Sequence, residues 1–122
     1  MKKFSTSALA AGVALSLGAS LIGGSALAAD AEAAKTLARQ SGCFKGHGVE
    51  KAKDGPAWKD VSVKYVGKAD AEKKLIYHIT SGEKVKFADG HEEEHKIIKS
   101  EDQKEIKNLV DWILSLATEK TP

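Results

Sequence analysis

The sequence predicts an all-α fold, on three observations. Apolar residues recur at helical spacing in three segments, residues 31–40, 71–81 and 101–116, and capping or helix-stopping residues bound them. The stretches between these segments, residues 48–67 and 84–99, follow neither a helical nor a strand period. No β-hairpin signal, internal repeat or low-complexity tract interrupts the pattern. Three main helices joined by two long loops are therefore expected.

Capping residues mark the limits of these helices. Asp30 and Asp70 are the expected N-caps of the first and second helix. Gly42 and Gly82 stop the same two helices. The third helix starts at Ser100, which forms a capping box with the glutamine three residues later. The apolar residues expected to be buried are Ala34, Leu37 and Ala38 in the first helix, Leu75, Ile76 and Ile79 in the second, and Ile106, Leu109, Val110, Ile113 and Leu114 in the third.

The first 28 residues have the features of a secretory signal. Two lysines precede an apolar run over residues 8–22, and small residues lead up to Ala28, after which we expect cleavage. The run is too short for a stable membrane anchor. Residues 29–122 are therefore expected to form one domain, exported through the Sec route to the periplasm and monomeric there.

The charge of the expected mature domain is balanced. The chain has 19 Lys and Arg residues and 17 Asp and Glu residues, and the signal accounts for two of the lysines and none of the acids. The remaining 17 basic and 17 acidic residues cancel. Nucleic-acid binding loses its main electrostatic support, because that role depends on an excess of positive charge.

The expected domain is small for a core built from its own side chains alone. Its 94 residues, out of 122, bury only ~60–65% of the surface that the unfolded chain exposes. A single cysteine cannot form an internal disulfide. Residues 48–67 contain a Gly55-Pro56 turn and one helical turn around residues 58–65, but otherwise read as a long loop, which is uncommon unless it wraps something. A large apolar cofactor would supply the missing core volume.

Residues 41–48, with the sequence SGCFKGHG, contain the only cysteine, Cys43, and a histidine four positions later, His47. Residues three and four apart lie on one face of a helical turn, so Cys43, Gly46 and His47 would point at the same object. Haem of the c type is attached by the pattern C-x-x-C-H, in which cysteine thiols bond the haem and the histidine ligates iron. Here Gly46 stands in place of the second cysteine.

From this motif onwards the chain resembles the small bacterial class I c-type cytochromes, over nearly all of residues 29–122. The shared features are the helix before the motif, Gly55-Pro56 after it, Tyr65-Val66-Gly67 closing the next loop, and the final WILSL segment. The resemblance implies the class I cytochrome c fold, in which long loops wrap one haem and the first and last helices pack together. It also implies electron transfer between redox partner proteins and no enzymatic activity. His47 would be the proximal iron ligand, and its Nδ1 would bond the Pro56 carbonyl.

Two positions depart from that family's pattern. With Gly46 in the motif, only one thioether, through Cys43, is expected, and one haem vinyl group stays unreacted. The family's usual distal methionine is also missing, because Met1 is the only methionine and belongs to the signal. His95 lies near the family's methionine position and is the favoured distal ligand, with His91 as the alternative. Two histidine ligands imply a lower reduction potential than histidine with methionine.

Other interpretations of the same residues stay open. Cys43, His47, His91 and His95 also make a plausible Cys-His₃ set for zinc or copper without haem. A haem protein whose sixth position is open or labile, acting as a gas sensor or carrier, is a further alternative. His78 is expected to be an ordinary surface or partly buried helix residue. No paired carboxylates, nucleophile elbow or phosphate loop indicate an enzyme.

Lysines are concentrated around the haem motif. Most of these lysines are expected to be solvated surface residues. In the cytochrome interpretation they also steer an acidic redox partner towards the haem edge, which raises the association rate more than the affinity. The lysines are Lys45, Lys51, Lys53, Lys59, Lys64 and Lys68.

Overall fold

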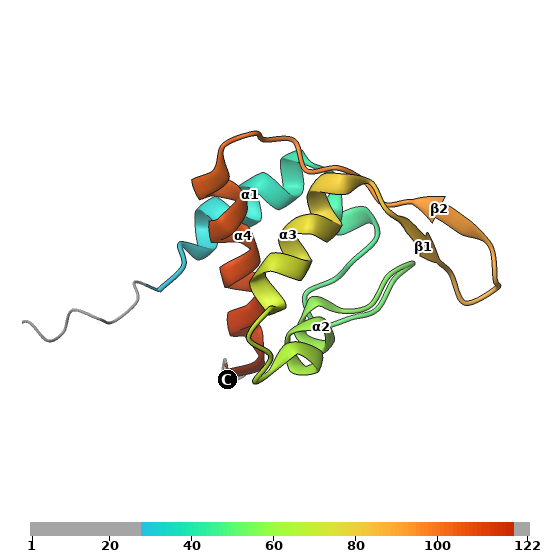
Figure 1. Ribbon diagram of the computed structural model, residues 1–122, viewed down its shortest axis with the longest axis horizontal. Helices are drawn as coiled ribbons and strands as arrows, with labels where there is room; N and C mark the ends of the chain where they lie inside the picture. Colours follow the sequence, from blue (N-terminus) through green and yellow to red (C-terminus); the bar gives the residue numbers. More distant parts are fainter. Residues whose placement is uncertain (1–27, 119–122) are drawn as a thin grey trace, which may run out of the picture.

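The computed structural model describes residues 28–118 of the 122-residue chain (Figure 1). The helices are α1 (Ala31–Gln40), α2 (Trp58–Tyr65), α3 (Ala71–Ser81) and α4 (Gln103–Ser115), the strands are β1 (Lys84–Lys86) and β2 (Glu92–Glu94), and the 3-10 turns are η2 (Cys43–Lys45) and η3 (Leu116–Thr118). All but the last residue of the predicted signal lies outside the described residues. Between residues 28 and 118, no helix is long and apolar enough to cross a membrane.

The centre of the core lies where α1 packs across the upper part of α4 (Figure 1). Ala34 and Ala38 of α1 are at most 1% exposed, and their small side chains allow the two helices to approach closely. At the start of α1, the Asp30 N–H donates to Asn108 Oδ1 at 2.8 Å, and Asn108 Nδ2 donates to the Asp30 carbonyl at 2.9 Å. Because α2 and α3 also pack on α4, the last helix contacts the three others.

Helix α2 corrects one expectation, because residues 58–65 form a complete eight-residue helix rather than one turn within a loop. Its buried residues, Trp58 and Ser62, are four positions apart and share a face. Ser62 Oγ donates to the Leu114 carbonyl at 2.6 Å and accepts from the Ala117 N–H at 2.9 Å, where α4 ends. A buried serine thus stands where a helical pattern calls for an apolar residue, and this obscured the period.

A two-stranded antiparallel hairpin, β1 paired with β2, stands where the sequence predicted only an irregular loop. Lys84 faces Glu94 and Lys86 faces Glu92, so opposite charges meet across the strands. Gly90 adopts a φ of 94° in the turn, a conformation that favours glycine. The strands are three residues long, and the second contains only glutamates, which is why the pattern did not indicate them. The hairpin projects from the helical body (Figure 1).

The N-termini of two helices also differ from expectation. Helix α4 begins two residues later than predicted, with Asp102 as its N-cap. Ser100 lies before this cap, where its Oγ accepts from the Asp102 N–H at 3.1 Å and donates to Glu105 at 2.8 Å. Asp70 makes no capping bond at the start of α3 and instead pairs with Lys74 at 3.2 Å. Both differences move a boundary or a contact without changing the order of the helices.

Candidate cofactor site

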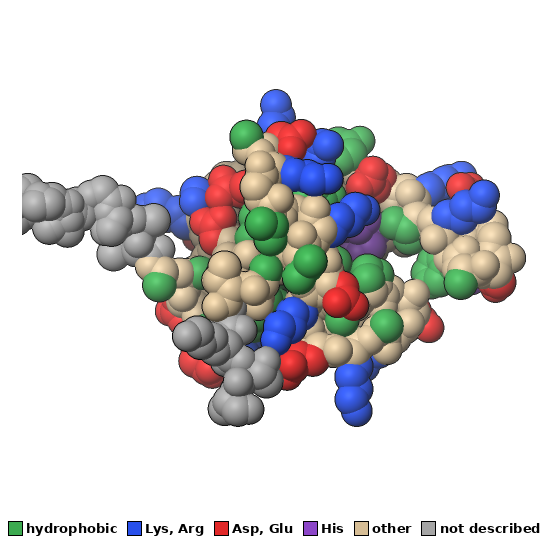
Figure 2. Space-filling view, turned by 90° about the horizontal axis from the view of Figure 1, so that it is seen from below, with side chains coloured by type: hydrophobic (Ala, Val, Ile, Leu, Met, Phe, Trp, Pro, Cys, Tyr) green, Lys and Arg blue, Asp and Glu red, His purple; other side chains and the backbone are tan. Residues whose placement is uncertain are grey.

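A cavity of about 1130 Å³ opens between the helices and the hairpin. Its walls come from η2 and the loop that follows, from α2, α3 and α4, and from both strands. Figure 2 shows a histidine side chain in the recess between the helical body and the hairpin. Since pockets for drug-sized ligands usually have volumes of about 300–1,000 Å³, this cavity has room for a large cofactor.

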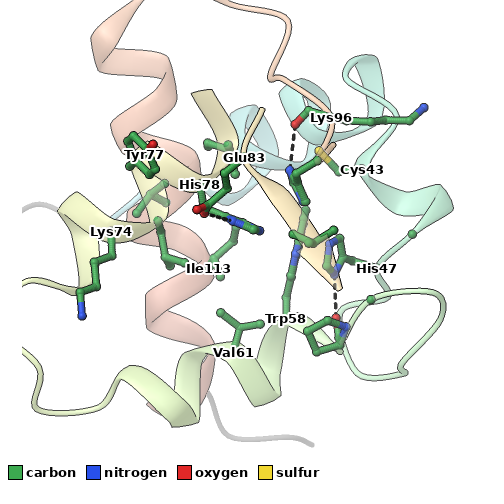
Figure 3. A pocket seen from close by; sticks show the side chains of 18 of the residues that line it. Cys43, His47, Trp58, Val61, Lys74, Tyr77, His78, Glu83, Lys96 and Ile113 are labelled. Carbon is green, nitrogen blue, oxygen red and sulfur yellow. Dashed lines mark hydrogen bonds and ion pairs between the residues drawn. The ribbon is translucent and has the colours of Figure 1, made fainter. Parts of the chain in front are cut away.

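His47 projects into the cavity from the loop after η2 (Figure 3). Its Nδ1 lies 2.8 Å from the Pro56 carbonyl oxygen. Because a carbonyl only accepts, Nδ1 carries the proton and the lone pair is on Nε2. Trp58 stacks on the imidazole with 5.7 Å between ring centres. Burial lowers the pKa of His47 below its ordinary value, so the ring is neutral and its Nε2 is available as a ligand.

Backbone hydrogen bonds hold the loop that carries His47. The Gly55 N–H donates to the Gly46 carbonyl at 2.7 Å, and the Trp58 N–H donates to the Gly48 carbonyl at 2.9 Å. Gly55 also lies directly against the His47 ring, where a Cβ would overlap the imidazole atoms. His47 is therefore positioned by local contacts within residues 46–58.

Cys43 and Gly46 both line the cavity, as their places in one turn predict. Cys43 is a free, partly exposed thiol, and burial raises its pKa above the ordinary value, against smaller opposing effects of a backbone hydrogen bond and Lys96. Gly46 has a φ of −108°, which any residue adopts, and no heavy atom lies within 4 Å of where its Cβ would be. The backbone at position 46 can therefore carry a cysteine side chain without strain.

His95 also lines the cavity, and its ring centre is 5.9 Å from that of His47. Its Nδ1 lies 2.9 Å from the Lys96 carbonyl, so it too carries its proton on Nδ1 and its lone pair on Nε2. Burial, followed by the neighbouring His78, lowers the pKa of His95 below its ordinary value. His95 is thus a second neutral imidazole in the cavity lining, and it comes from a separate segment of the chain.

His91, the alternative distal ligand, lies on the hairpin and is not among the residues that line the cavity. Its Nδ1 contacts Asp89, its Nε2 lies 2.7 Å from Glu93, and its ring stacks on Phe87 at 4.4 Å between centres. Hydrogen bonds to Glu93 and then Asp89 raise the pKa of His91 above its ordinary value. Both nitrogens of His91 are therefore engaged by carboxylates.

His78 is the cavity residue that the sequence interpretation missed. It lies on α3, its Nδ1 is 2.6 Å from Glu83 Oε2, and its ring centre is 4.1 Å from that of His95. His78 is a partly buried helix residue, as expected, but the sequence interpretation did not place it in the cavity wall. The available signal was its position three residues after the buried Leu75, on the same face of the helix.

The alternative zinc or copper set is not assembled. Within the described part of the chain, no group of three or more His, Cys, Asp and Glu side chains is placed to hold a metal ion. In particular, His91 is held on the hairpin by its acidic neighbours, away from the cavity that the other three predicted ligands line. The structure contradicts a Cys-His₃ centre for this reason.

The residues that line the cavity do fit a haem. Two imidazoles that bind one metal ion from opposite sides, with nitrogens at ~2 Å, have ring centres about 6 Å apart, and the rings of His47 and His95 are 5.9 Å apart. Both have their Nδ1 atoms bonded to carbonyls, which is the usual arrangement of metal-binding histidines. Cys43 supplies a thiol in the same wall.

Comparisons with known proteins agree with this arrangement. Residues 31–117 match the family model described as Cytochrome c. Cytochrome c-551 of Allochromatium vinosum is 39% identical over 80 residues, which cover 66% of this chain and 82% of that protein. The class 1 cytochrome MtoD of Sideroxydans lithotrophicus, whose crystal structure is known, is 67% identical in sequence. The two structures superpose with a TM-score of 0.70 over 73% of this chain and 98% of that one. Cytochrome c552 of Nitrosomonas europaea is 32% identical, with a TM-score of 0.55 over 67% and 98% of the two chains.

Proposed function

Since the chain belongs to the cytochrome c family and is therefore a haem electron carrier rather than an enzyme, we propose that it works in the periplasm with a haem ligated by His47 and His95. The observation that carries this proposal is the pair of neutral imidazoles in the cavity lining, whose ring centres are 5.9 Å apart. Each has a backbone carbonyl on Nδ1 and an uncommitted Nε2. Together the two side chains would hold the haem iron and leave no position on it for a substrate.

The haem supplies the couple between ferric and ferrous iron, and the chain supplies its position and environment. The Pro56 carbonyl fixes the tautomer of His47 and raises its basicity as a ligand. Trp58 covers one face of this imidazole, and Val110 and Ile113 of α4 contribute apolar wall that excludes water. Since methionine ligation raises the reduction potential of a haem, a pair of histidines gives a carrier of low potential.

We attribute covalent attachment to a single thioether, through Cys43. Cys43 is the chain's only cysteine, so no second thioether can form. The space beside Gly46 then receives an unreacted vinyl group. The pyridine haemochrome spectrum tests this directly: one thioether gives a band between those of free haem and of haem with two thioethers. A band at the two-thioether position would contradict the assignment.

We further propose that the chain is exported and that it meets an acidic redox partner near the cavity. The signal-like sequence supports cleavage after Ala28 and a mature domain of residues 29–122, which mass spectrometry of the purified protein checks. Of the lysines near the motif, Lys45 and Lys64 line the cavity and can meet an acidic partner there. Lys53 instead bonds the Phe44 carbonyl at 2.6 Å, so it has a structural contact within the loop.

The experiment that tests the iron ligands compares His95→Ala with His91→Ala in haem-loaded protein. We expect His95→Ala to change the ferric EPR spectrum, through new low-spin g values or conversion to high spin. His91→Ala is the matched control and leaves the spectrum unchanged, because His91 lies outside the cavity. Unchanged spectra in both variants, with carbon monoxide binding by the unmodified ferrous protein, would show an open sixth position and favour the gas sensor or carrier.

A further inference from the structure

A second histidine is in contact with the proposed distal ligand. His78 and His95 have ring centres 4.1 Å apart, and both line the cavity that His47 enters from the other side. His78 comes from α3, a regular helix, whereas His95 follows the last residue of β2. Figure 3 shows His78 and His47 reaching into the cavity from α3 and from the loop after η2. Two imidazoles therefore approach the distal side from separate elements.

Glu83 holds both of these histidines. Its carboxylate accepts a hydrogen bond from His78 Nδ1 at 2.6 Å, and its backbone carbonyl accepts one from the His95 N–H at 2.9 Å. Because Nδ1 donates to the carboxylate, Nε2 is the nitrogen of His78 that can offer a lone pair to a metal ion. A histidine whose other nitrogen donates to a carboxylate is the usual arrangement of a metal ligand, and the carboxylate makes the imidazole a stronger donor. His78 thus has the chemistry of an iron ligand.

We infer that His78 is a second distal ligand of the haem iron, which binds in place of His95 when His95 moves away. The inference rests on the proposed haem site. One imidazole nitrogen replaces another as ligand, so the exchange involves no electron transfer and no co-reactant. The bond from Glu83 to the His95 backbone keeps the two rings adjacent, so the exchange requires only local movement. The consequence is an iron that stays six-coordinate and closed to small gases even without His95.

The test uses haem-loaded His95→Ala, His78→Ala and the double variant, with His91→Ala as a histidine control outside the cavity. We expect His95→Ala to keep a low-spin ferric EPR signal with altered g values, because His78 takes over. The double variant becomes high-spin, and its ferrous form binds carbon monoxide rapidly. If His95→Ala folds poorly, His78→Ala alone is informative, because the ferrous protein should bind carbon monoxide severalfold faster without the competing imidazole.

Glu83→Gln tests whether His78 needs its carboxylate partner in order to bind iron, because the variant keeps the imidazole ring and removes the carboxylate. The substitution removes the carboxylate partner of His78, whereas the backbone carbonyl of residue 83, which bonds the His95 N–H, remains. In the His95→Ala background it weakens binding of His78 to iron by about ten- to a hundredfold, as loss of such a partner usually does. The high-spin fraction therefore increases.

Two outcomes would overturn the inference. A His95→Ala protein that is fully high-spin, and binds carbon monoxide as fast as the double variant, would leave His95 as the ligand and remove His78 from that role. A high-spin His78→Ala protein together with an unchanged His95→Ala protein would make His78 the resident ligand and contradict the proposed role of His95. The first result spares the proposed function, and the second does not.

Discussion

The two walls of the cavity position their histidines in different ways. The proximal wall, residues 43–58, presents one imidazole, which Pro56 holds at Nδ1 and Trp58 covers on a face. The distal wall, residues 78–95, presents two imidazoles in contact with one another, both bonded to Glu83. The position of His47 thus depends on contacts a few residues away, whereas that of His95 depends on how a helix and a hairpin meet. With the iron ligands that we propose, the protein would have one ligand without a substitute and one with a substitute.

The largest effect that distinguishes the walls is loss of His47. A ligand present at about 1,000 times its Kd adds about 4 kcal/mol to the free energy of unfolding, and His47→Ala should lose stability of this order. His95→Ala should lose less, because His78 remains. Denaturant unfolding of both haem-loaded proteins measures the difference. Equal stability of the two variants would remove the contrast between the walls.

Replacing one glycine in each wall by alanine adds a methyl group and tests how tightly that wall is packed. Gly55→Ala places its Cβ in the His47 ring, and overpacking of this kind costs about 1–3 kcal/mol. Gly90→Ala is the distal counterpart, because Gly90 has a φ of 94° but no atom within 4 Å of an added Cβ. It should cost about 1 kcal/mol, confined to the hairpin. Thermal unfolding together with the EPR spectrum checks both, and only Gly55→Ala should alter the spectrum.

Position 46 allows the proximal wall to be strengthened. Gly46→Cys places a second thiol in open space, and we expect a second thioether, a haemochrome band of the two-thioether type and a higher yield of haem protein. Gly46→Ala is the matched control, because it fills the same space without a thiol. It should gain only about 0.4–1 kcal/mol from reduced freedom of the unfolded chain. A lower yield with Gly46→Cys than with Gly46→Ala would contradict the steric argument.

The smallest expected effect is a pH dependence of the hairpin. Glu93 and Asp89 raise the pKa of His91 above its ordinary value of about 6.5. Protonated His91 therefore stabilises the hairpin fully below pH ~6.5. This stabilisation is lost as the pH rises through the higher pKa that His91 has in the folded protein. Proton NMR of the contact between His91 and Phe87 should show this loss in the hairpin while the helices stay unchanged. His91→Asn, which does not titrate, should abolish the dependence.

Local signals in the sequence account for what could be predicted. The helical fold class and the cytochrome family are confirmed, and they follow from caps, apolar spacing and a compact motif around Cys43 and His47. Helix α2 was missed because buried Ser62 is polar, and the hairpin was missed because its strands pair by charge. His78 was missed because its place in the cavity depends on the meeting of α3 with the distal loop. Separations set by tertiary contacts are not visible in a local pattern.

The paired hydrogen bonds between Asp30 and Asn108 have a consequence for the order of assembly. They join residues 78 positions apart, so the first helix cannot complete its packing until the last has been synthesised. Contacts this distant in sequence close slowly, because the intervening chain must first lose its freedom. The Cys43 turn follows α1 directly and is therefore still open when it emerges. If the chain is exported and attached to haem through Cys43, as we propose, it presents this residue before the domain closes around the haem.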